Sequence, residues 1–288
     1  MRIGFIGFGE AAQAFVASLR RHNPRMSFIA WDTDTSPAMA RAMAGSGVTL
    51  VEPAAFSGAD WVFSAVTADQ SLIAVQTIAP HICQGQWLID INSVSPKRKV
   101  ASAALIEAAG GHYLDMAVMA PVLPRGHATP VLIAGAQADE IAPLLSDIGF
   151  AARIIGPEPG QATAIKMIRS LFVKGLEAIT VEALLAAEAA GCGDEILASL
   201  SGSYPGLGWP DIATYQFERS LKHGGRRAAE MVESAATIAD LGLNAALPHA
   251  IADTHRAMGQ IGAQSPSLAP DQTAQILAAR LAQKEPKP

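Results

Sequence analysis

Short apolar runs alternate with helical segments along the first 156 residues, and this alternation restricts the possible folds more than any other feature. Several runs are apolar throughout, as expected for strands that are covered on both faces of a sheet. Helices between successive strands favour parallel pairing. We therefore expect a parallel, doubly wound α/β sheet with strands near residues 2–6, 27–32, 48–51, 61–66, 87–91, 113–118, 131–134 and 153–155, and helices near residues 11–21, 37–44, 70–78, 97–109 and 139–148.

The pattern changes at Gly160. From there to about Ala190 the sequence predicts one long helix, with Pro159 directly before it and Gly191 directly after it. Beyond this helix we expect only further helices, near residues 194–200, 211–222, 226–241, 246–258 and 270–283. The prediction is a Rossmann-type domain (1–159), an all-helical C-terminal domain joined to it by the long interdomain helix (160–283), and a flexible tail (284–288).

Composition excludes several classes of protein. Half of the residues are hydrophobic and 16% are charged, which is too apolar for a disordered chain. Two cysteines do not make a disulfide framework, and the seven histidines lack same-face metal-ligand spacing, so no metal site is predicted. A net charge of −5 gives no support to nucleic-acid binding. No apolar run reaches about 18 residues, and Glu10 interrupts the N-terminal run too early for a signal peptide. We expect a cytoplasmic protein without a membrane span.

A glycine-rich segment follows the first predicted strand. Its residues fit the pattern G-x-G-x-x-G/A between a strand and a helix, and they are Gly7, Phe8, Gly9, Glu10, Ala11 and Ala12. The first glycine permits a tight turn, the second lets the backbone approach a pyrophosphate, and the small last residue allows close packing of helix on strand. The amides of the helix N-terminus then face the phosphates. The segment therefore predicts a dinucleotide site.

Asp32 strengthens this prediction. It lies 20 residues after Ala12, at the end of the second predicted strand, where a carboxylate accepts hydrogen bonds from the adenosine ribose. Asp32 and the nearby Asp34 also repel a 2′-phosphate, and no arginine follows directly. We therefore expect NAD rather than NADP as the cofactor. The alternative is that Asp32 is an ordinary turn residue before the helix that begins at Pro37.

Four stretches resemble segments of one enzyme family, in the same order. They are the glycine loop; residues 90–96, similar to the family's D-x-S-T-x-x-P; residues 114–121, similar to D-A-P-V-S-G-G; and residues 160–170, similar to G-x-x-x-x-x-K-x-x-N-N. Residues 131–149 also look like the strand and helix that end the family's first domain. The chain thus resembles the β-hydroxyacid dehydrogenases, that is, 3-hydroxyisobutyrate dehydrogenase and its relatives, allied to 6-phosphogluconate dehydrogenase. The resemblance covers nearly all of residues 1–190.

The resemblance implies which residues act on the substrate. Lys166 matches the family's catalytic lysine, and Ser93 lies in the segment after the fifth strand. The Ser-Gly-Gly that holds the substrate carboxylate in the family is replaced by Met119, Ala120 and Pro121, and the two asparagines after the lysine are replaced by Arg169 and Ser170. These departures imply that the chemistry is kept while the substrate differs. The resemblance also implies a homo-oligomer, because family members are commonly dimers or tetramers built through the helical domain.

A lysine suits the chemistry of a dehydrogenase. When a hydride leaves the carbinol carbon, an amine within hydrogen-bond reach can take the hydroxyl proton, and it can return that proton when a ketone is reduced. Burial and the nearby nicotinamide cation favour the neutral amine that this requires. Ser170 is the i+4 neighbour of Lys166 on the same helix face and can bind the same substrate. Spacing alone also allows Lys166 to be a solvated surface charge.

Several other side chains keep two interpretations. Ser93 either binds the substrate or the nicotinamide ribose, or forms a local turn before Pro96. Thr67 either lines the cofactor groove or caps a loop. Asp115 is favoured as a structural hydrogen-bonding residue, and Arg125 as a surface residue rather than a carboxylate anchor. Residues 203–210 either cap the substrate or only connect helices.

The sequence as a whole predicts an NAD-dependent oxidoreductase. It transfers a hydride between NAD and the carbinol carbon of a β-hydroxy acid or related alcohol, with Lys166 as general acid and base and with Ser93 and Ser170 positioning the substrate. Two alternatives are kept. One is an imine reductase, whose family shares the two-domain plan and usually lacks the lysine. The other is a non-catalytic NAD(H)-binding sensor.

Overall fold

The structure is a computed structural model that describes residues 1–264 and 273–283. The chain divides into two compact units, Met1–Met167 and Ile168–Pro288. The division falls after Met167 rather than after Pro159, because the first turn of the long helix is hydrogen-bonded to the sheet of the first unit. The predicted tail, residues 284–288, lies outside the described residues.

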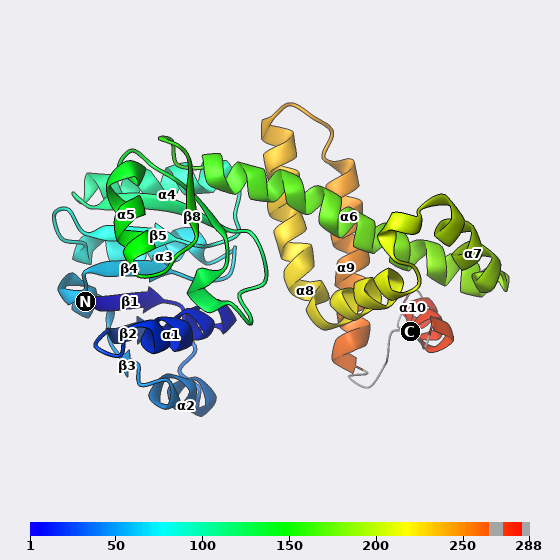
Figure 1. The fold of residues 1–288 in the computed structure, drawn as a ribbon, viewed down its shortest axis with the longest axis horizontal. Coiled ribbons are helices and arrows are strands. Elements are labelled where there is room, and N and C mark those ends of the chain that lie inside the picture. Colours follow the sequence, from blue (N-terminus) through cyan, green and yellow to red (C-terminus); the bar gives the residue numbers. More distant parts are fainter. Residues whose placement is uncertain (265–272, 284–288) are drawn as a thin grey trace. The chain divides into compact units, whose positions relative to one another are not determined.

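The first unit contains one eight-stranded sheet, and Figure 1 shows it together with its helices. The strands lie in the order β3-β2-β1-β4-β5-β6-β7-β8, which places the first strand beside the fourth, as in a doubly wound fold. Each strand overlaps a predicted one. Their bounds are β1 Arg2–Ile6, β2 Ser27–Trp31, β3 Thr49–Leu50, β4 Trp61–Ser64, β5 Trp87–Asp90, β6 His112–Val118, β7 Val131–Ala134 and β8 Ala152–Gly156.

One pairing differs from the expected parallel sheet. Strand β7 runs antiparallel to β6, while all other neighbours are parallel. A parallel partner requires a crossover of a dozen or more residues, usually through a helix. The segment between β6 and β7 holds only the short 3₁₀ turn Gly126–Ala128, so the chain returns in the opposite direction.

Helices and apolar clusters cover the sheet. The helices are α1 Glu10–His22, α2 Pro37–Gly45, α3 Ser71–Ile78, α4 Pro96–Ala108 and α5 Ala138–Asp147, with 3₁₀ turns at Pro53–Gly58 and Ala79–His81. Successive residues of a strand point to opposite faces. Phe5 therefore packs in one core with Phe63, their ring centroids 5.3 Å apart, while Ile6 packs in a second core with Val62. This double burial explains why several of the strand runs are apolar throughout.

The second unit is helical throughout its described residues. Helix α6 (Gln161–Ala190) begins in the first unit and continues into the second, where α7 (Gly193–Ser203), α8 (Asp211–Asp240), α9 (Ala246–Gln264), α10 (Thr273–Ala282) and a 3₁₀ turn at Pro205–Leu207 follow. Its main core joins Val181 of α6 to Phe217 of α8 and Met258 of α9. No helix among the described residues is both long enough and apolar enough to cross a membrane.

Two predicted helices, 211–222 and 226–241, form a single helix, and the prediction of a break between them was wrong. Both Gly224 and Gly225 lie within α8, and α9 passes very close to α8 at Gly224 (Figure 1). A Cβ on Gly224 would lie 2.5 Å from the backbone N of Gly259, and closer still to the carbonyl of His255. The glycine thus serves close packing of two helices rather than a turn. The last predicted helix, 270–283, is α10, and residues 270–272 lie outside the described residues.

Candidate functional site

The glycine loop has the backbone that its sequence predicts. Gly7 has a φ of +83°, and a Cβ there would lie 2.5 Å from the carbonyl oxygen of Ala65, so only glycine fits. Gly9 is the N-cap of α1, and a Cβ there would meet no atom within 4 Å. Gly7 therefore serves the fold, whereas the open space beside Gly9 leaves room for a ligand to approach the backbone.

The other residues of the loop have separate roles. The side chain of Phe8 is fully buried in the core under α1, and that of Ala12 is also fully buried, which allows α1 to pack closely on the sheet. Ala11 is half-buried and packs against the same core, whereas Glu10 is exposed in the first turn of α1. The loop thus offers backbone rather than apolar side chains to a ligand.

Asp32 ties the loop after β2 to the glycine loop. One carboxylate oxygen accepts a hydrogen bond from the amide of Phe8 at 2.7 Å, and the other accepts one from the amide of Asp34 at 2.8 Å. A carboxylate oxygen has two lone pairs, so each can accept one more donor. Hydrogen bonds from Ser36 lower the pKa of Asp34, which keeps a second negative charge beside Asp32 at neutral pH.

A cavity of about 220 Å³ opens between these loops. It lies beside the carboxyl ends of β1, β2 and β4, where open α/β sheets bind ligands. None of its lining side chains, among the residues that the structure describes, is a lysine or arginine. They are Gly7, Gly9, Trp31, Asp32, Thr33, Met39, Ala65, Val66, Thr67, Gln70, Ile73 and Ala74. The cavity suits a half-apolar ligand with hydroxyl groups near Asp32.

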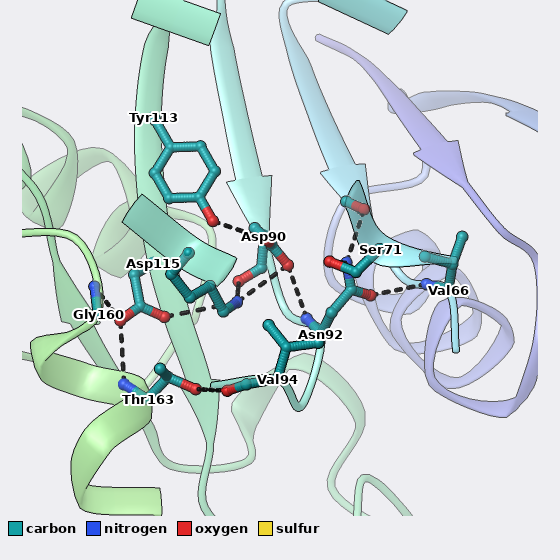
Figure 2. A network of polar contacts seen from close by, with 11 residues as sticks. Val66, Ser71, Asp90, Asn92, Val94, Tyr113, Asp115, Gly160 and Thr163 are labelled. Atoms are coloured by element: carbon teal, nitrogen blue, oxygen red, sulfur yellow. Dashed lines mark hydrogen bonds and ion pairs between the residues drawn. The ribbon is translucent and has the colours of Figure 1, made fainter. Parts of the chain in front are cut away.

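The segment after β5 is held in place by Asn92. Its amide oxygen accepts a hydrogen bond from the backbone N of Val66 (Figure 2), with a distance of 2.7 Å. Its amide nitrogen donates to the hydroxyl of Ser64 at 2.8 Å. Ser93, the next residue, is half-buried, and Thr67 is exposed at the edge of the cavity. Sequence reasoning missed Asn92, although it stands at the serine of the D-x-S-T pattern.

Asp115 binds the beginning of α6. One oxygen of its fully buried carboxylate accepts hydrogen bonds from the amides of Gly160 and Thr163, both at 3.0 Å (Figure 2). The hydroxyl of Thr163 also donates to the carbonyl of Val94 at 3.1 Å. The predicted structural hydrogen-bonding role of Asp115 is thereby confirmed.

A buried lysine lies next to the Asp115 carboxylate. The Nζ of Lys99, on α4, lies 2.9 Å from a carboxylate oxygen of Asp90 and 3.5 Å from the other oxygen of Asp115. It also donates to the carbonyl of Asp90 at 2.7 Å, and Tyr113 donates its hydroxyl to the Asp90 carboxylate at 2.7 Å. Sequence reasoning missed Lys99, because the periodicity of α4 alone gives no reason to bury a lysine.

Lys166 lies on α6, three residues after Thr163, and is half-buried. Ser170 follows four residues later on the same helix, beyond the boundary between the units. The hydroxyl oxygen of Ser170 accepts a hydrogen bond from the Nζ of Lys174 at 3.1 Å. Because Lys174 can only donate, the Ser170 hydroxyl keeps its own proton for another acceptor.

The predicted substrate segment follows β6. Met119 is half-buried, while Ala120 and Pro121 are exposed, and no side chain of the three offers a hydrogen-bond donor. Arg125 is exposed too, as its interpretation as a surface residue predicts. Residues 203–210 contain the 3₁₀ turn before α8, with an exposed Tyr204.

The helical unit holds a cluster of buried charges that sequence reasoning also missed. Arg227 of α8 contacts Glu177 of α6 at 2.7 Å, and Lys174 contacts Glu230 at 2.9 Å. His255 of α9 lies fully buried, with its Nε2 3.1 Å from the carbonyl of Lys174. Burial lowers the pKa of His255 to about 4 and raises the pKa of Glu177 against the effect of Arg227.

Comparisons with known proteins agree with this architecture. Residues 2–156 match the family model described as the NAD binding domain of 6-phosphogluconate dehydrogenase, which is more than half of the chain. A conserved hypothetical protein from Sinorhizobium meliloti 1021 is 36% identical, with 97% of this chain and 96% of that chain covered and a TM-score of 0.75. The conserved protein MTH1747, of unknown function and described as structurally similar to 3-hydroxyacid dehydrogenases, is 30% identical (92% and 99% covered, TM-score 0.70).

The chain belongs to the β-hydroxyacid dehydrogenase family.

Two further matches concern the fold of the chain and its helical unit. A 3-hydroxyisobutyrate dehydrogenase from Mycobacterium tuberculosis, solved with L-serine, is 18% identical over 99% of each chain with a TM-score of 0.71, and it shares the fold alone. Residues 187–258 match a domain of unknown function (DUF1932). The nucleotide-binding unit is therefore of a well-known type, whereas the helical unit matches a domain with no described activity.

Proposed function

We propose that this protein is an NAD-dependent dehydrogenase that transfers a hydride between NAD and the carbinol carbon of a β-hydroxy acid or related alcohol. One observation carries the proposal. The helix that bears Lys166 begins at the carboxyl end of the sheet, where Asp115 and Val94 hold its first turn. The lysine thus belongs to the same unit, and to the same edge of the sheet, as the glycine loop.

The residues around the cavity fit a dinucleotide. The open space beside Gly9 suits a pyrophosphate, and the free lone pairs of Asp32 suit the ribose hydroxyls. Thr67 and Ile73 then line the adenosine half. When bound, the nicotinamide supplies the hydride acceptor or donor that no amino-acid side chain provides.

We propose NAD rather than NADP because of the charges around the cavity. Asp32 and Asp34 place negative charge where a 2′-phosphate would lie, and the cavity lining described above offers no cation to balance it. Titration with NADH and with NADPH, followed by protein fluorescence, tests this choice. We expect NADH to bind at least about tenfold tighter. Tighter binding of NADPH would contradict the role given to Asp32.

Lys166 is proposed as the general acid and base. Its amine takes the hydroxyl proton as the alcohol is oxidised, and it gives the proton back when the ketone is reduced. The Ser170 hydroxyl, which accepts from Lys174, is left to donate toward the substrate. Ser93, beside the Asn92 anchor, is proposed to hold a second substrate oxygen.

The substrate class follows from what residues 119–121 lack. Met119, Ala120 and Pro121 offer no hydroxyl, and proline has no amide proton, so this segment binds a carboxylate more weakly than Ser-Gly-Gly does. We therefore propose that the substrate carries an apolar group against this segment. A screen of 3-hydroxy acids and related alcohols, with branched and aromatic members, tests it through the absorbance of NADH.

The mechanism is tested with two lysine variants. Lys166→Ala should bind NADH as the wild type does and lose turnover by about 10²-fold or more. Lys222→Ala removes an exposed lysine of α8 and should leave both properties unchanged. Unchanged turnover in Lys166→Ala would contradict the mechanism. Reduction of imines that does not depend on Lys166 would indicate an imine reductase, and NADH binding with no turnover would indicate a sensor.

We also propose that the protein is a homo-oligomer that associates through the helical unit. Ile168, Phe172 and Ile179 lie four and seven residues apart on α6, hence on one helix face. They are 48%, 74% and 64% exposed. An exposed apolar stripe of this kind is typical of protein–protein interfaces, and a second copy presents the same stripe.

A further inference from the structure

We propose that Asp115 is a positioning residue for Lys166. Its carboxylate fixes the first turn of α6, and through that turn it fixes where the lysine amine meets the substrate. This inference rests on the proposed function, in which Lys166 transfers the proton. It assigns a catalytic consequence to the two buried hydrogen bonds that Asp115 accepts from the amides of Gly160 and Thr163, outside the cofactor cavity (Figure 2).

The contact is a helix cap supplied from a distant part of the sequence. The amide of Ala164 donates to the carbonyl of Gly160, so Gly160 is the N-cap and Thr163 is the third residue of the helix. In a capping box, two local side chains bind these two amides. Gly160 has no side chain, and a single carboxylate oxygen of Asp115 binds both amides instead.

Glycine is required where the cap forms. Gly160 has a φ of +99°, and a Cβ there would lie 3.1 Å from both the carbonyl oxygen and the Cβ of Pro96. The N-terminus of α6 therefore approaches the first turn of α4 closely, and this approach rules out a local capping side chain. The hydroxyl of Thr163, bound to Val94, holds the same turn from a second side.

Lys99 lies beside the cap and favours its charged form. Burial and the neighbouring Asp90 raise the pKa of Asp115, while Lys99 and the amides of Thr163 and Gly160 act in the opposite direction. A carboxylate oxygen binds backbone amides more strongly than a neutral acceptor does. Asp90 in turn fixes Lys99 through its carboxylate and its carbonyl.

The network connects the cap to the cofactor cavity. Asp90 accepts from the amide of Asn92 at 2.8 Å, and Asn92 binds the amide of Val66, which lines the cavity. A continuous chain of polar contacts therefore runs from the cavity edge through Asp90 and Lys99 to Asp115. Figure 2 shows Asn92, Asp90 and Asp115 along this chain. This chain fixes the loop after β4, the loop after β5 and the start of α6 against one another within the first unit.

Lys166 receives the effect of the cap through the helix backbone. It follows Thr163 by three residues, less than one helical turn, over which an α-helix is stiff. Proton transfer requires the amine within about 3 Å of the substrate oxygen. A misplacement of about 1 Å can cost on the order of 10²-fold in rate. Loss of the cap should therefore lower kcat more than it changes cofactor affinity.

Three variants separate positioning from stability. Asp115→Ala removes both hydrogen bonds to α6. Asp115→Asn keeps an acceptor oxygen of the same size but turns a donor toward Lys99. Tyr113→Phe is the matched control, because it removes a buried hydrogen bond to Asp90 from the same network and leaves the bonds to α6 intact. We expect Asp115→Ala to lower kcat about 10²-fold and Asp115→Asn about tenfold, with NADH affinity within about twofold of wild type. Tyr113→Phe should leave kcat unchanged.

A second measurement works without turnover. Reductive ¹³C-methylation gives each lysine an NMR signal, and Lys166→Arg identifies the one that belongs to Lys166. We expect this signal to shift in Asp115→Asn and not in Tyr113→Phe. If Asp115→Ala does not fold, the comparison is made between Asp115→Asn and Tyr113→Phe.

The outcomes distinguish the two proposals. Wild-type protein without dehydrogenase turnover would refute the proposed function, while a shifted Lys166 signal in Asp115→Asn would still support the positioning by the cap. Turnover and a Lys166 signal that are alike in Asp115→Asn and Tyr113→Phe would overturn the inference.

Discussion

Two neighbouring glycines of α8 should respond in opposite ways to the same substitution. Gly224 faces α9, where a Cβ would lie 2.5 Å from the N and 2.7 Å from the Cα of Gly259. Gly225 is exposed, and a Cβ there would meet nothing within 4 Å. Gly224→Ala and Gly225→Ala therefore change helix propensity equally and differ only in packing.

The magnitudes follow from these distances. Replacing glycine by alanine inside a helix stabilises it by about 1 kcal/mol, and Gly225→Ala should show this gain in full. In Gly224→Ala the new Cβ would lie 2.5 Å from the backbone N of Gly259, whereas ordinary van der Waals contact begins at 3.4 Å. Helices α8 and α9 must therefore move apart by 0.9 Å or more. Overpacking costs about 1–3 kcal/mol, and we expect about 3 kcal/mol here because the opposing atoms are backbone. The net loss for Gly224→Ala is about 2 kcal/mol.

Thermal unfolding followed by circular dichroism at 222 nm measures both changes. For a unit of this size, 1 kcal/mol corresponds to about 4 °C in Tm, so we expect Gly225→Ala about 4 °C above and Gly224→Ala about 8 °C below the wild type. Hydrogen exchange of peptides from α8 and α9 assigns the transition to the helical unit. A Gly224→Ala protein as stable as Gly225→Ala would refute the close packing of these helices.

Three further predictions concern the cofactor, pH and assembly. Gly9→Ala should change the unfolding free energy by no more than about 1 kcal/mol and weaken NADH binding at least about tenfold in a fluorescence titration; unchanged affinity would contradict the role of the loop. Burial holds the pKa of His255 at about 4, so the unfolded chain binds more protons between pH 6.5 and 4, and stability should fall by up to about 3 kcal/mol as the pH is lowered through that window. The raised pKa of Glu177 opposes this fall, so the wild type is compared with His255→Gln. The difference between their free energies of unfolding in urea should shrink toward pH 4, and a constant difference would refute the role given to His255. Phe172→Glu should lower the mass found by light scattering after gel filtration, and an unchanged mass would exclude this face of α6 from the interface.

Local patterns in the sequence predict much of this fold. Sequence runs mark all eight strands, and β1, β4, β5 and β7 are apolar along almost their whole length because they are buried on both faces of the sheet. The glycine loop is equally readable, since Gly7 needs a positive φ and a position without a side chain. The start of α6 follows from Pro159 and Gly160. In each case a short stretch of the sequence carries the signal, even where the contact that requires it, as between Gly7 and Ala65, comes from a distant residue.

Contacts between distant segments decided the rest. The direction of β7 depends on a connection without a crossover helix, and the continuity of α8 depends on Gly224 meeting Gly259. Nothing near Gly160 in the sequence shows that Asp115, 45 residues earlier, caps α6. Nor does the pattern of α4 show that Lys99 is buried between two carboxylates. The sequence by itself determined where Lys166 lies along the chain, but only the tertiary structure decided what holds it, because buried hydrogen bonds are satisfied by whichever groups the fold brings together.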